Sequence, residues 1–217
     1  MRLLAPVLDE LVFVGGCTTG LFITDPAASG IRPTRDVDAI VDVASYARYS
    51  ALSERLRALG LTEDTTPGAP LCRWRRDDLI VDVMPVDEEI LGFSNRWYPM
   101  AVETAGRLEI AGHTVRVVAP ALFVATKLEA FHGRGTGDVV ASHDLEDIIA
   151  VVDGRTEIVN DVAAADTGVR GYIADEIRAL LDDADFLEAL AGFLLPDRAS
   201  QARRGLLENR LRQLTSR

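Results

Sequence analysis

A strand-like alternation runs through Asp36-Val37-Asp38-Ala39-Ile40-Val41-Asp42, and this stretch decides how the rest of the chain is interpreted. Successive side chains of a strand point to opposite faces, so the strand has one apolar face and one polar face that carries Asp36 and Asp38. Their spacing of two residues places the two side chains about 6.5–7 Å apart. The stretch therefore predicts a half-buried strand that presents two carboxylates side by side.

A glycine turn precedes this strand in the chain. The apolar run Val12-Phe13-Val14 ends at Gly15-Gly16, and residues 18–23 then have the composition of a helix that stops before Pro26. A strand, a glycine turn and a helix in this order bring backbone amides and a helix N-terminus together, which suits phosphate binding. Taken alone, two adjacent glycines more often form a plain tight turn than a phosphate site.

A third carboxylate, Asp82, stands in the middle of a later apolar run. Residues 71–75 and 79–84 are both strand-like, which predicts a hairpin with Asp82 in its second strand. Because burying an unpaired carboxylate costs several kcal/mol, Asp82 is expected to have a partner. Two alternatives are open at this point: a bound cation, or an ion pair with Arg73 or Arg75 across the hairpin.

Three converging carboxylates predict a site for a hard divalent cation. Cys17, Cys72 and the three scattered histidines lack the spacing of zinc ligands, whereas carboxylates are abundant and are preferred by Mg²⁺. Two Mg²⁺ ions about 3.5–4 Å apart neutralise a triphosphate and fix in-line geometry in nucleotidyl transfer. In this interpretation all three aspartates are metal ligands and catalytic residues, and Asp82 is also the general base for an acceptor hydroxyl.

The remaining pattern predicts an α+β fold, with a mixed sheet flanked by helices and followed by a helical lobe. We place the boundary near Pro120, so that residues 1–118 form the catalytic core and residues 119–217 form the helical lobe. A further hairpin is expected at 108–118. The predicted later helices are 45–59, 120–132, 143–152, 156–164, 170–183, 186–194 and 199–215.

Composition limits the partners. The 217 residues carry 23 Lys plus Arg against 34 Asp plus Glu, a net charge of −11, so a generally basic surface for nucleic acid is not expected. Six arginines between Pro196 and Arg217 nevertheless give that segment a net charge of +4. No apolar run is long enough to span a bilayer and no secretory signal is recognisable, so we expect a cytoplasmic protein without a membrane partner.

The three motifs together resemble the DNA polymerase beta-like nucleotidyltransferase superfamily. Its pattern is a Gly-Gly or Gly-Ser turn, an Asp-x-Asp pair and a distal Asp, and the matching stretches here are Val14-Gly15-Gly16-Cys17-Thr18, Thr34-Arg35-Asp36-Val37-Asp38-Ala39-Ile40 and Ile80-Val81-Asp82-Val83-Met84-Pro85. Within the superfamily the chain looks most like the AbiEii/AbiGii toxin-type proteins. Those proteins carry a Lys, then an Arg, then an Asp-x-x-Asp helix, as do Lys127, Arg134 and His143-Asp144-Leu145-Glu146-Asp147.

The resemblance implies roles for further residues. It implies that Lys127 contacts a nucleotide phosphate and that Asp144 orients the lysine or completes the site. The other expected nucleotide-binding residues are Gly15, Gly16, Thr18 and Arg35. A solvated lysine and ordinary first-turn acids are the alternatives for the residues of the later helices.

The implied reaction moves NMP from an NTP to an acceptor hydroxyl and releases pyrophosphate. In the toxin-type interpretation the acceptor is RNA, such as a tRNA 3′ end, or a protein side chain, and an antitoxin protein is a further partner. A second interpretation takes a small cationic acceptor of the aminoglycoside type, which the acidic composition favours. A third is a non-catalytic binding module of the same fold, although retained, mutually repelling carboxylates argue against it.

Overall fold

The computed structural model describes residues 2–28, 30–43, 45–133 and 138–216. Contacts divide these residues into two compact units. Unit 1 comprises Met1–Thr18 and Thr34–Ala119, and unit 2 comprises Thr19–Pro33 and Pro120–Arg217. The roles of catalytic core and helical lobe that the sequence suggests for 1–118 and 119–217 stay predictions.

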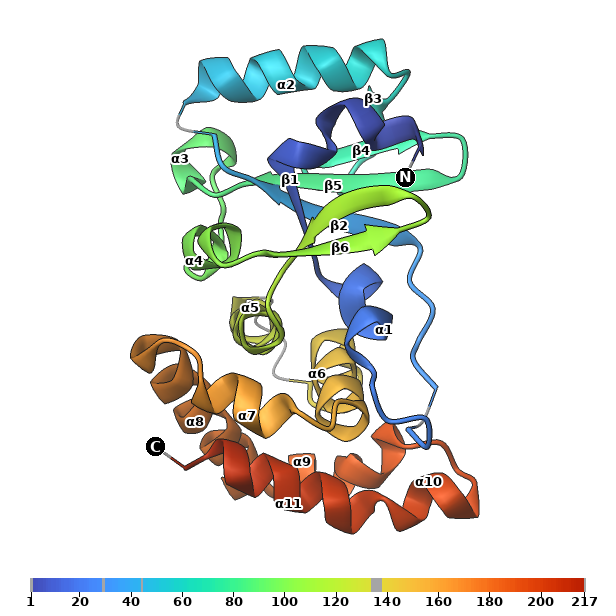
Figure 1. Cartoon of the computed structure of the whole chain (residues 1–217), viewed down its shortest axis with the longest axis vertical. Helices are drawn as coiled ribbons and strands as arrows, with labels where there is room; N and C mark the ends of the chain where they lie inside the picture. The colour runs from blue at the N-terminus through green and yellow to red at the C-terminus, as the bar shows by residue number, and fades with distance from the viewer. Residues whose placement is uncertain (1, 29, 44, 134–137, 217) are drawn as a thin grey trace. The chain divides into compact units, whose positions relative to one another are not determined.

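Unit 1 is built on a seven-stranded mixed sheet in the order β3-β4-β5-β2-β1-β7-β6 (Figure 1). Strands β2 and β5 are parallel, as are β1 and β7, and the other neighbours are antiparallel. This confirms the expected mixed sheet flanked by helices. The strands are β1 (Leu11–Val14), β2 (Asp36–Val41), β3 (Thr62–Glu63), β4 (Arg73–Arg76), β5 (Leu79–Pro85), β6 (Gly106–Ile110) and β7 (His113–Val117).

Helix α2 (Tyr46–Ala58) packs on this sheet through one apolar stripe. Ser45 caps its first turn by accepting a hydrogen bond from the amide of Arg48, as its position before the helix predicts. Tyr49 is buried and donates its hydroxyl to the backbone carbonyl of Val83 on β5, 2.9 Å away. Burial raises the pKa of the Tyr49 phenol, so this hydroxyl stays a donor that fixes helix to sheet. The remaining helical elements of unit 1 are η1 (Arg2–Glu10), η2 (Gly16–Thr18), α3 (Glu88–Leu91) and α4 (Tyr98–Glu103).

The regular elements described in unit 2 are all helices, and α5 (Pro120–Gly133) contacts three of them, α6 (His143–Gly154), α7 (Ile158–Ala163) and α8 (Thr167–Asp182). Most residues of α5 are buried, and Phe123 meets Phe22 of α1 (Thr19–Phe22) edge-to-face at 5.1 Å between ring centres. The other helices are α9 (Ala184–Ala189), η3 (Leu190–Phe193), α10 (Arg198–Ala202) and α11 (Arg204–Leu214). Within the described residues, no helix combines the length and apolar character needed to cross a membrane.

Candidate metal and nucleotide site

Sheet register brings the three predicted carboxylates together. Parallel pairing of β2 with β5 sets Asp38 beside Asp82, and Asp36 lies two residues back on the same face of β2. One carboxylate oxygen from each of the three residues lies within 4.8 Å of the other two. Asp82 is buried, while Asp36 and Asp38 are half-buried. The sequence pattern therefore predicted a real cluster, formed by two strands that are distant in the chain.

The donor set of this cluster fits a hard divalent cation. All three side chains offer anionic oxygens, which are the ligands that Mg²⁺ prefers. Thr34 donates its hydroxyl to Oδ1 of Asp36 at 2.6 Å, which fixes that carboxylate at the start of β2. These three residues could hold a metal ion.

Asp82 also has the cross-hairpin partner that the sequence left open. Arg73 of β4 donates from Nε and Nη2 to both carboxylate oxygens of Asp82, at 2.8 and 2.7 Å, and its Nη2 lies 3.4 Å from Oδ2 of Asp36. Hydrogen bonding to Asp82 raises the pKa of the Arg73 guanidinium above its ordinary value. Arg75 pairs with Asp64 instead, at 3.6 Å. Of the two candidate arginines, Arg73 is therefore the one that contacts the cluster.

Gly15 serves the cluster by leaving space for Asp38. Its backbone has a φ of +67°, and a Cβ placed on it would stand 2.1 Å from Oδ2 of Asp38. Both the left-handed backbone and this close approach require glycine. The hydroxyl and amide of Thr18 bond back to the carbonyl of Gly15, at 2.8 and 3.1 Å, and close the turn.

The remaining predicted site residues of unit 1 lie in two places. Gly16 begins η2 directly after Gly15, and Arg35 is exposed immediately before β2. Thr18 is buried with its hydroxyl engaged by the turn. The nucleotide-binding roles of Gly15, Gly16, Thr18 and Arg35 stay predictions.

Lys127 and Asp144 belong to a buried charge cluster in unit 2. The ammonium group of Lys127 on α5 lies 3.0 Å from Oδ1 of Asp144 and 2.7 Å from Oδ2 of Asp147, both on α6. Burial opposes the charged form of this lysine, but the two aspartates outweigh it and hold its pKa above its usual value. Arg32 approaches the same cluster, with its Nη2 3.7 Å from Asp147.

Two members of this cluster, Asp147 and Arg32, are not predicted as site residues from the sequence. Asp147 was recognised only as part of a motif, and Arg32 was not singled out because a lone arginine in a loop carries no pattern. The predicted contact of Lys127 with a phosphate stays a prediction. Arg134 lies outside the described residues.

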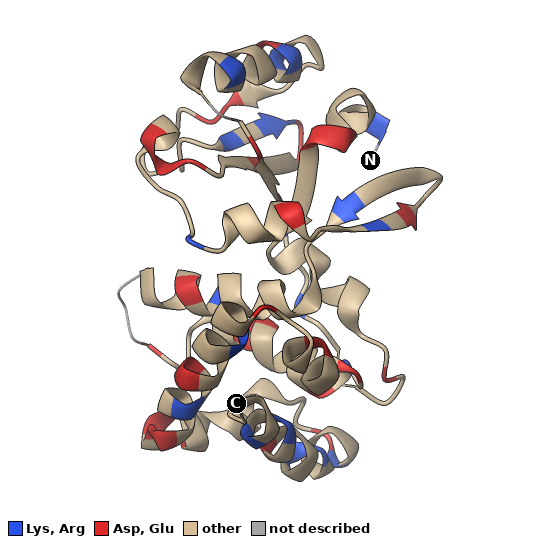
Figure 2. Ribbon diagram, turned by 60° about the vertical axis from the view of Figure 1, so that its left-hand side comes forward, with Lys and Arg blue, Asp and Glu red and all other residues tan. Residues whose placement is uncertain are grey.

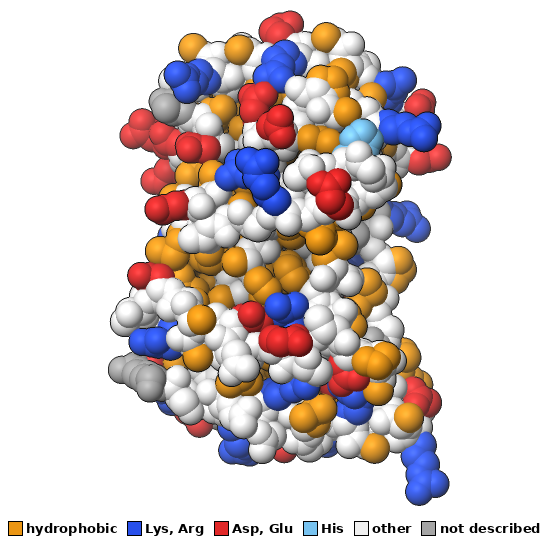
Figure 3. Space-filling view, viewed as in Figure 1, with side chains coloured by type: hydrophobic (Ala, Val, Ile, Leu, Met, Phe, Trp, Pro, Cys, Tyr) orange, Lys and Arg blue, Asp and Glu red, His pale blue; other side chains and the backbone are white. Residues whose placement is uncertain are grey.

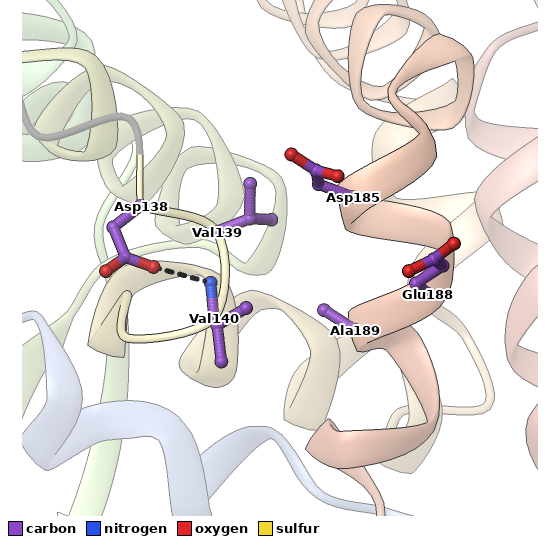
Figure 4. A pocket seen from close by; sticks show the side chains of 6 residues that line it. All are labelled: Asp138, Val139, Val140, Asp185, Glu188 and Ala189. Carbon is purple, nitrogen blue, oxygen red and sulfur yellow. Dashed lines mark hydrogen bonds between the residues drawn. The ribbon is translucent and has the colours of Figure 1, made fainter.

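A second acidic feature is a hollow in unit 2 (Figure 4). Its carboxylates come from the segment before α6 and from α9. One oxygen of Asp138 is already engaged, since it accepts hydrogen bonds from the amides of Val140 and Ala141, both at 3.0 Å. The hollow contains none of the predicted site residues and is lined by Asp138, Val139, Val140, Asp185, Glu188 and Ala189.

The basic segment at the C-terminus is used largely inside unit 2. Figure 2 shows basic positions along α10 and α11. Arg203 donates to Asp25 and Asp153, in each case at 2.8 Å, and the buried Arg210 donates to the carbonyls of Val152 and Asp153. The segment therefore offers less free positive charge than its composition suggests. On the face in Figure 3, acidic and basic side chains are interspersed.

Comparison with known proteins gives one structural similarity. No protein-family model matches the chain, and no curated protein matches it. Among solved structures, the chain is similar to a crystal structure described as an antigenic nucleotidyltransferase-like protein from Paracoccidioides brasiliensis. The two share 19% sequence identity with a TM-score of 0.46, over 86% of this chain and 89% of that chain.

Proposed function

We propose that the protein is a metal-dependent nucleotidyltransferase of the DNA polymerase beta-like superfamily. The observation that carries the proposal is the convergence of Asp36, Asp38 and Asp82 within 4.8 Å on neighbouring strands. Three anionic side chains at this distance repel one another and are tolerated with cationic partners. The Asp-x-Asp pair, the distal aspartate and the preceding glycine turn occur in the order typical of the superfamily.

In this function the side chains of the protein would bind the reactants, and one of them would act as a general base. Asp36, Asp38 and Asp82 would hold Mg²⁺, two ions in our proposal, which neutralises the charge of the triphosphate and of the leaving pyrophosphate. Asp82 would accept the proton of the acceptor hydroxyl as that oxygen attacks the α-phosphorus. The amides following Gly15 would face the phosphates, and Gly15 keeps Asp38 in place through its missing side chain.

Three further residues are proposed to bind or orient the nucleotide. Arg35 and Lys127 would provide positive charge toward the triphosphate, and Asp144 would orient Lys127, which it contacts at 3.0 Å. The order of Lys127, Arg134 and the Asp144–Asp147 pair supports the toxin-type subgroup. That subgroup implies RNA or a protein as acceptor and an antitoxin as partner.

A small cationic acceptor of the aminoglycoside type is the second candidate. The net charge of −11 favours a cation, and Arg203 and Arg210 are engaged in contacts with Asp25 and Asp153 rather than available for RNA. RNA, protein and small cationic acceptors are therefore tested in separate reactions.

To test this, the purified full chain is incubated with Mg²⁺ and each of the four α-labelled NTPs. Parallel reactions contain total tRNA, a protein mixture or an aminoglycoside as the acceptor. We expect label to reach one acceptor class with release of pyrophosphate. Asp38→Asn should lower this rate at least about a hundredfold because it removes a metal ligand. Asp42→Asn is the matched control, since Asp42 follows the same strand but lies outside the cluster, and it should retain the rate.

Two results would count against the proposal. Equal transfer rates for the wild type and Asp38→Asn would show that the carboxylate cluster does not take part in the reaction. No transfer to any acceptor by the wild type would favour the non-catalytic binding module.

A further inference from the structure

Arg73 faces the carboxylate cluster from the next strand of the sheet. The β4–β5 register pairs Arg73 with Asp82, and the β5–β2 register pairs Asp82 with Asp38. Residues paired directly across neighbouring strands project from the same face of a sheet. One arginine and two aspartates therefore form a single row across three strands, and the hydrogen-bonded sheet fixes the position of Arg73.

The guanidinium occupies oxygen atoms that a divalent cation would also use. It binds Asp82 through two parallel hydrogen bonds of 2.8 and 2.7 Å, which is the strongest geometry for an arginine and a carboxylate. It also approaches Asp36 at 3.4 Å. Two of the three predicted metal ligands thus contact the same cationic side chain.

Charge explains why the cluster needs this arginine. Three ionised aspartates would carry −3, and Arg73 reduces that to −2. An arginine stays protonated at any pH in which the protein is folded, so the guanidinium cannot leave the cluster by losing a proton. It can only move, and a divalent cation that takes Asp82 oxygens has to compete with it.

We propose that Arg73 is a resident counter-cation and that the divalent metal binds by displacing its guanidinium from Asp82 and Asp36. The inference rests on the proposed function, because it takes the three aspartates as the metal site. Before metal binds, Arg73 holds the carboxylates in register. After exchange, its donors are free for an anion beside the metal. Arg73 is therefore a positioning residue that keeps the metal-free site assembled and lowers its metal affinity.

The test measures Mn²⁺ binding calorimetrically in the wild type, Arg73→Gln and Arg75→Gln. Arg75 is a matched control because it stands on the same strand and face but pairs with Asp64. Removing one positive charge within a few ångströms of the bound cation should tighten Mn²⁺ binding by Arg73→Gln about tenfold. Arg75→Gln should bind nearly as the wild type does, because screening weakens more distant charges.

Thermal unfolding provides a second readout. Without metal, Arg73→Gln should melt at a lower temperature than the wild type, because its carboxylates lack their counter-cation. Mn²⁺ should then raise its melting temperature by more than it raises that of the wild type. If Arg73→Gln does not fold, Arg73→Lys keeps the charge without the paired hydrogen bonds and should bind Mn²⁺ more tightly than the wild type.

The outcomes separate this inference from the proposed function. Mn²⁺ affinity in Arg73→Gln or Arg73→Lys at or below that of the wild type would overturn the exchange while leaving the metal site intact. A wild type that does not bind Mn²⁺, or binds it equally well after Asp38→Asn, would overturn the proposed function and this inference together.

Discussion

Gly15 and Asp38 approach each other so closely that no other residue fits at position 15. A Cβ there would stand 2.1 Å from the Asp38 carboxylate, and the φ of +67° adds backbone strain for any other residue. From the sequence, the glycine turn is expected to offer backbone amides to a phosphate. In the structure, the clearest role of Gly15 is to leave room for the carboxylate of Asp38. This contact brings together two segments that the sequence shows separately.

Gly15→Ala should therefore weaken metal binding by moving Asp38. The matched control is Gly68→Ala, because Gly68 has a similar φ of +86° and a Cβ placed on it would meet nothing within 4 Å. Both variants should lose about 1 kcal/mol of stability from the positive φ, and Gly15→Ala should lose more because the Asp38 side chain has to move. Only Gly15→Ala should lose Mn²⁺ affinity, measured calorimetrically. Equal affinities in the two variants would show that Asp38 is not a ligand.

The two cysteines should differ sharply in reactivity. Cys72 is buried directly before β4, and burial followed by the charge of Asp82 raises the pKa of its thiol to about 12. Since the thiolate is the reactive form, Cys72 should resist iodoacetamide at pH 8, whereas the half-buried Cys17 reacts. Mass spectrometry of the labelled native protein checks this. Modification of Cys72 in the native state would contradict the burial of this side chain.

The arginine partner of Asp82 could not be predicted from the sequence, although the three aspartates could. The alternation of β2 and β5 is visible in the sequence, so Asp36, Asp38 and Asp82 could be assigned to one site. The choice between Arg73 and Arg75 could not be made, because both lie on the same face of β4 and only the register with β5 sets one beside Asp82.

At the scale of elements, the buried charges of α5 and α6 hold two helices together. Lys127 has two aspartate partners in a nearly dry environment, so its removal takes away the cation that lies 3.0 Å from Asp144 and 2.7 Å from Asp147. Lys127→Met should lower the free energy of unfolding by about 3–5 kcal/mol. Chemical denaturation measures this loss. A decrease of less than about 1 kcal/mol in the free energy of unfolding would mean that Asp144 and Asp147 do not need Lys127 to stay buried together.

The pH dependence of this cluster follows from the direction of the lysine shift. The pKa of Lys127 is raised in the folded state, so its contribution is complete below the unfolded pKa of about 10.4. It should be lost only as pH rises through the still higher folded value. The stability difference between wild type and Lys127→Met, measured by denaturation, should therefore be constant from pH 6 to 9. A difference that shrinks within this range would contradict a raised pKa.

The segment predicted as a helix at 199–215 is helical but is divided into two elements. The helix breaks at Arg203, between α10 and α11, where the side chain reaches Asp153 and Asp25. Helical periodicity continues through the break, and contacts 50 and 178 residues away cannot be recognised from local sequence. The short elements η1, β3, α3 and α4 were also not predicted, because most of them are too brief to show a period.

Arg203→Ala should destabilise the chain far more than Arg204→Ala. Arg203 is largely buried between two aspartates, and its loss should cost about 3 kcal/mol. Arg204 forms an exposed pair with Glu208 one turn on, worth about 0.3–0.5 kcal/mol. Thermal unfolding of the two variants compares neighbouring positions directly. Equal melting temperatures of the two variants would show that the contacts of Arg203 do not stabilise unit 2.

At the scale of the whole molecule, the sequence predicted the succession of a mixed sheet and a helical segment correctly. It did not reveal that Thr19–Pro33 packs with the later helices. The amides of Thr24 and Asp25 both donate to the carbonyl of Gly154 at 2.9 Å, and Gly154 leaves room for Ile23. A loop rich in small residues carries no pattern that names such a distant partner.

The proposed chemistry depends on three aspartates from two strands forming one divalent-cation site. This site is tested most directly by anomalous diffraction from a crystal of the full chain soaked in Mn²⁺. We expect an anomalous peak in contact with the carboxylates of Asp36, Asp38 and Asp82, with Arg73 withdrawn from Asp82. Saturating Mn²⁺ that leaves no peak among these three residues, with the Arg73–Asp82 pair intact, would contradict it.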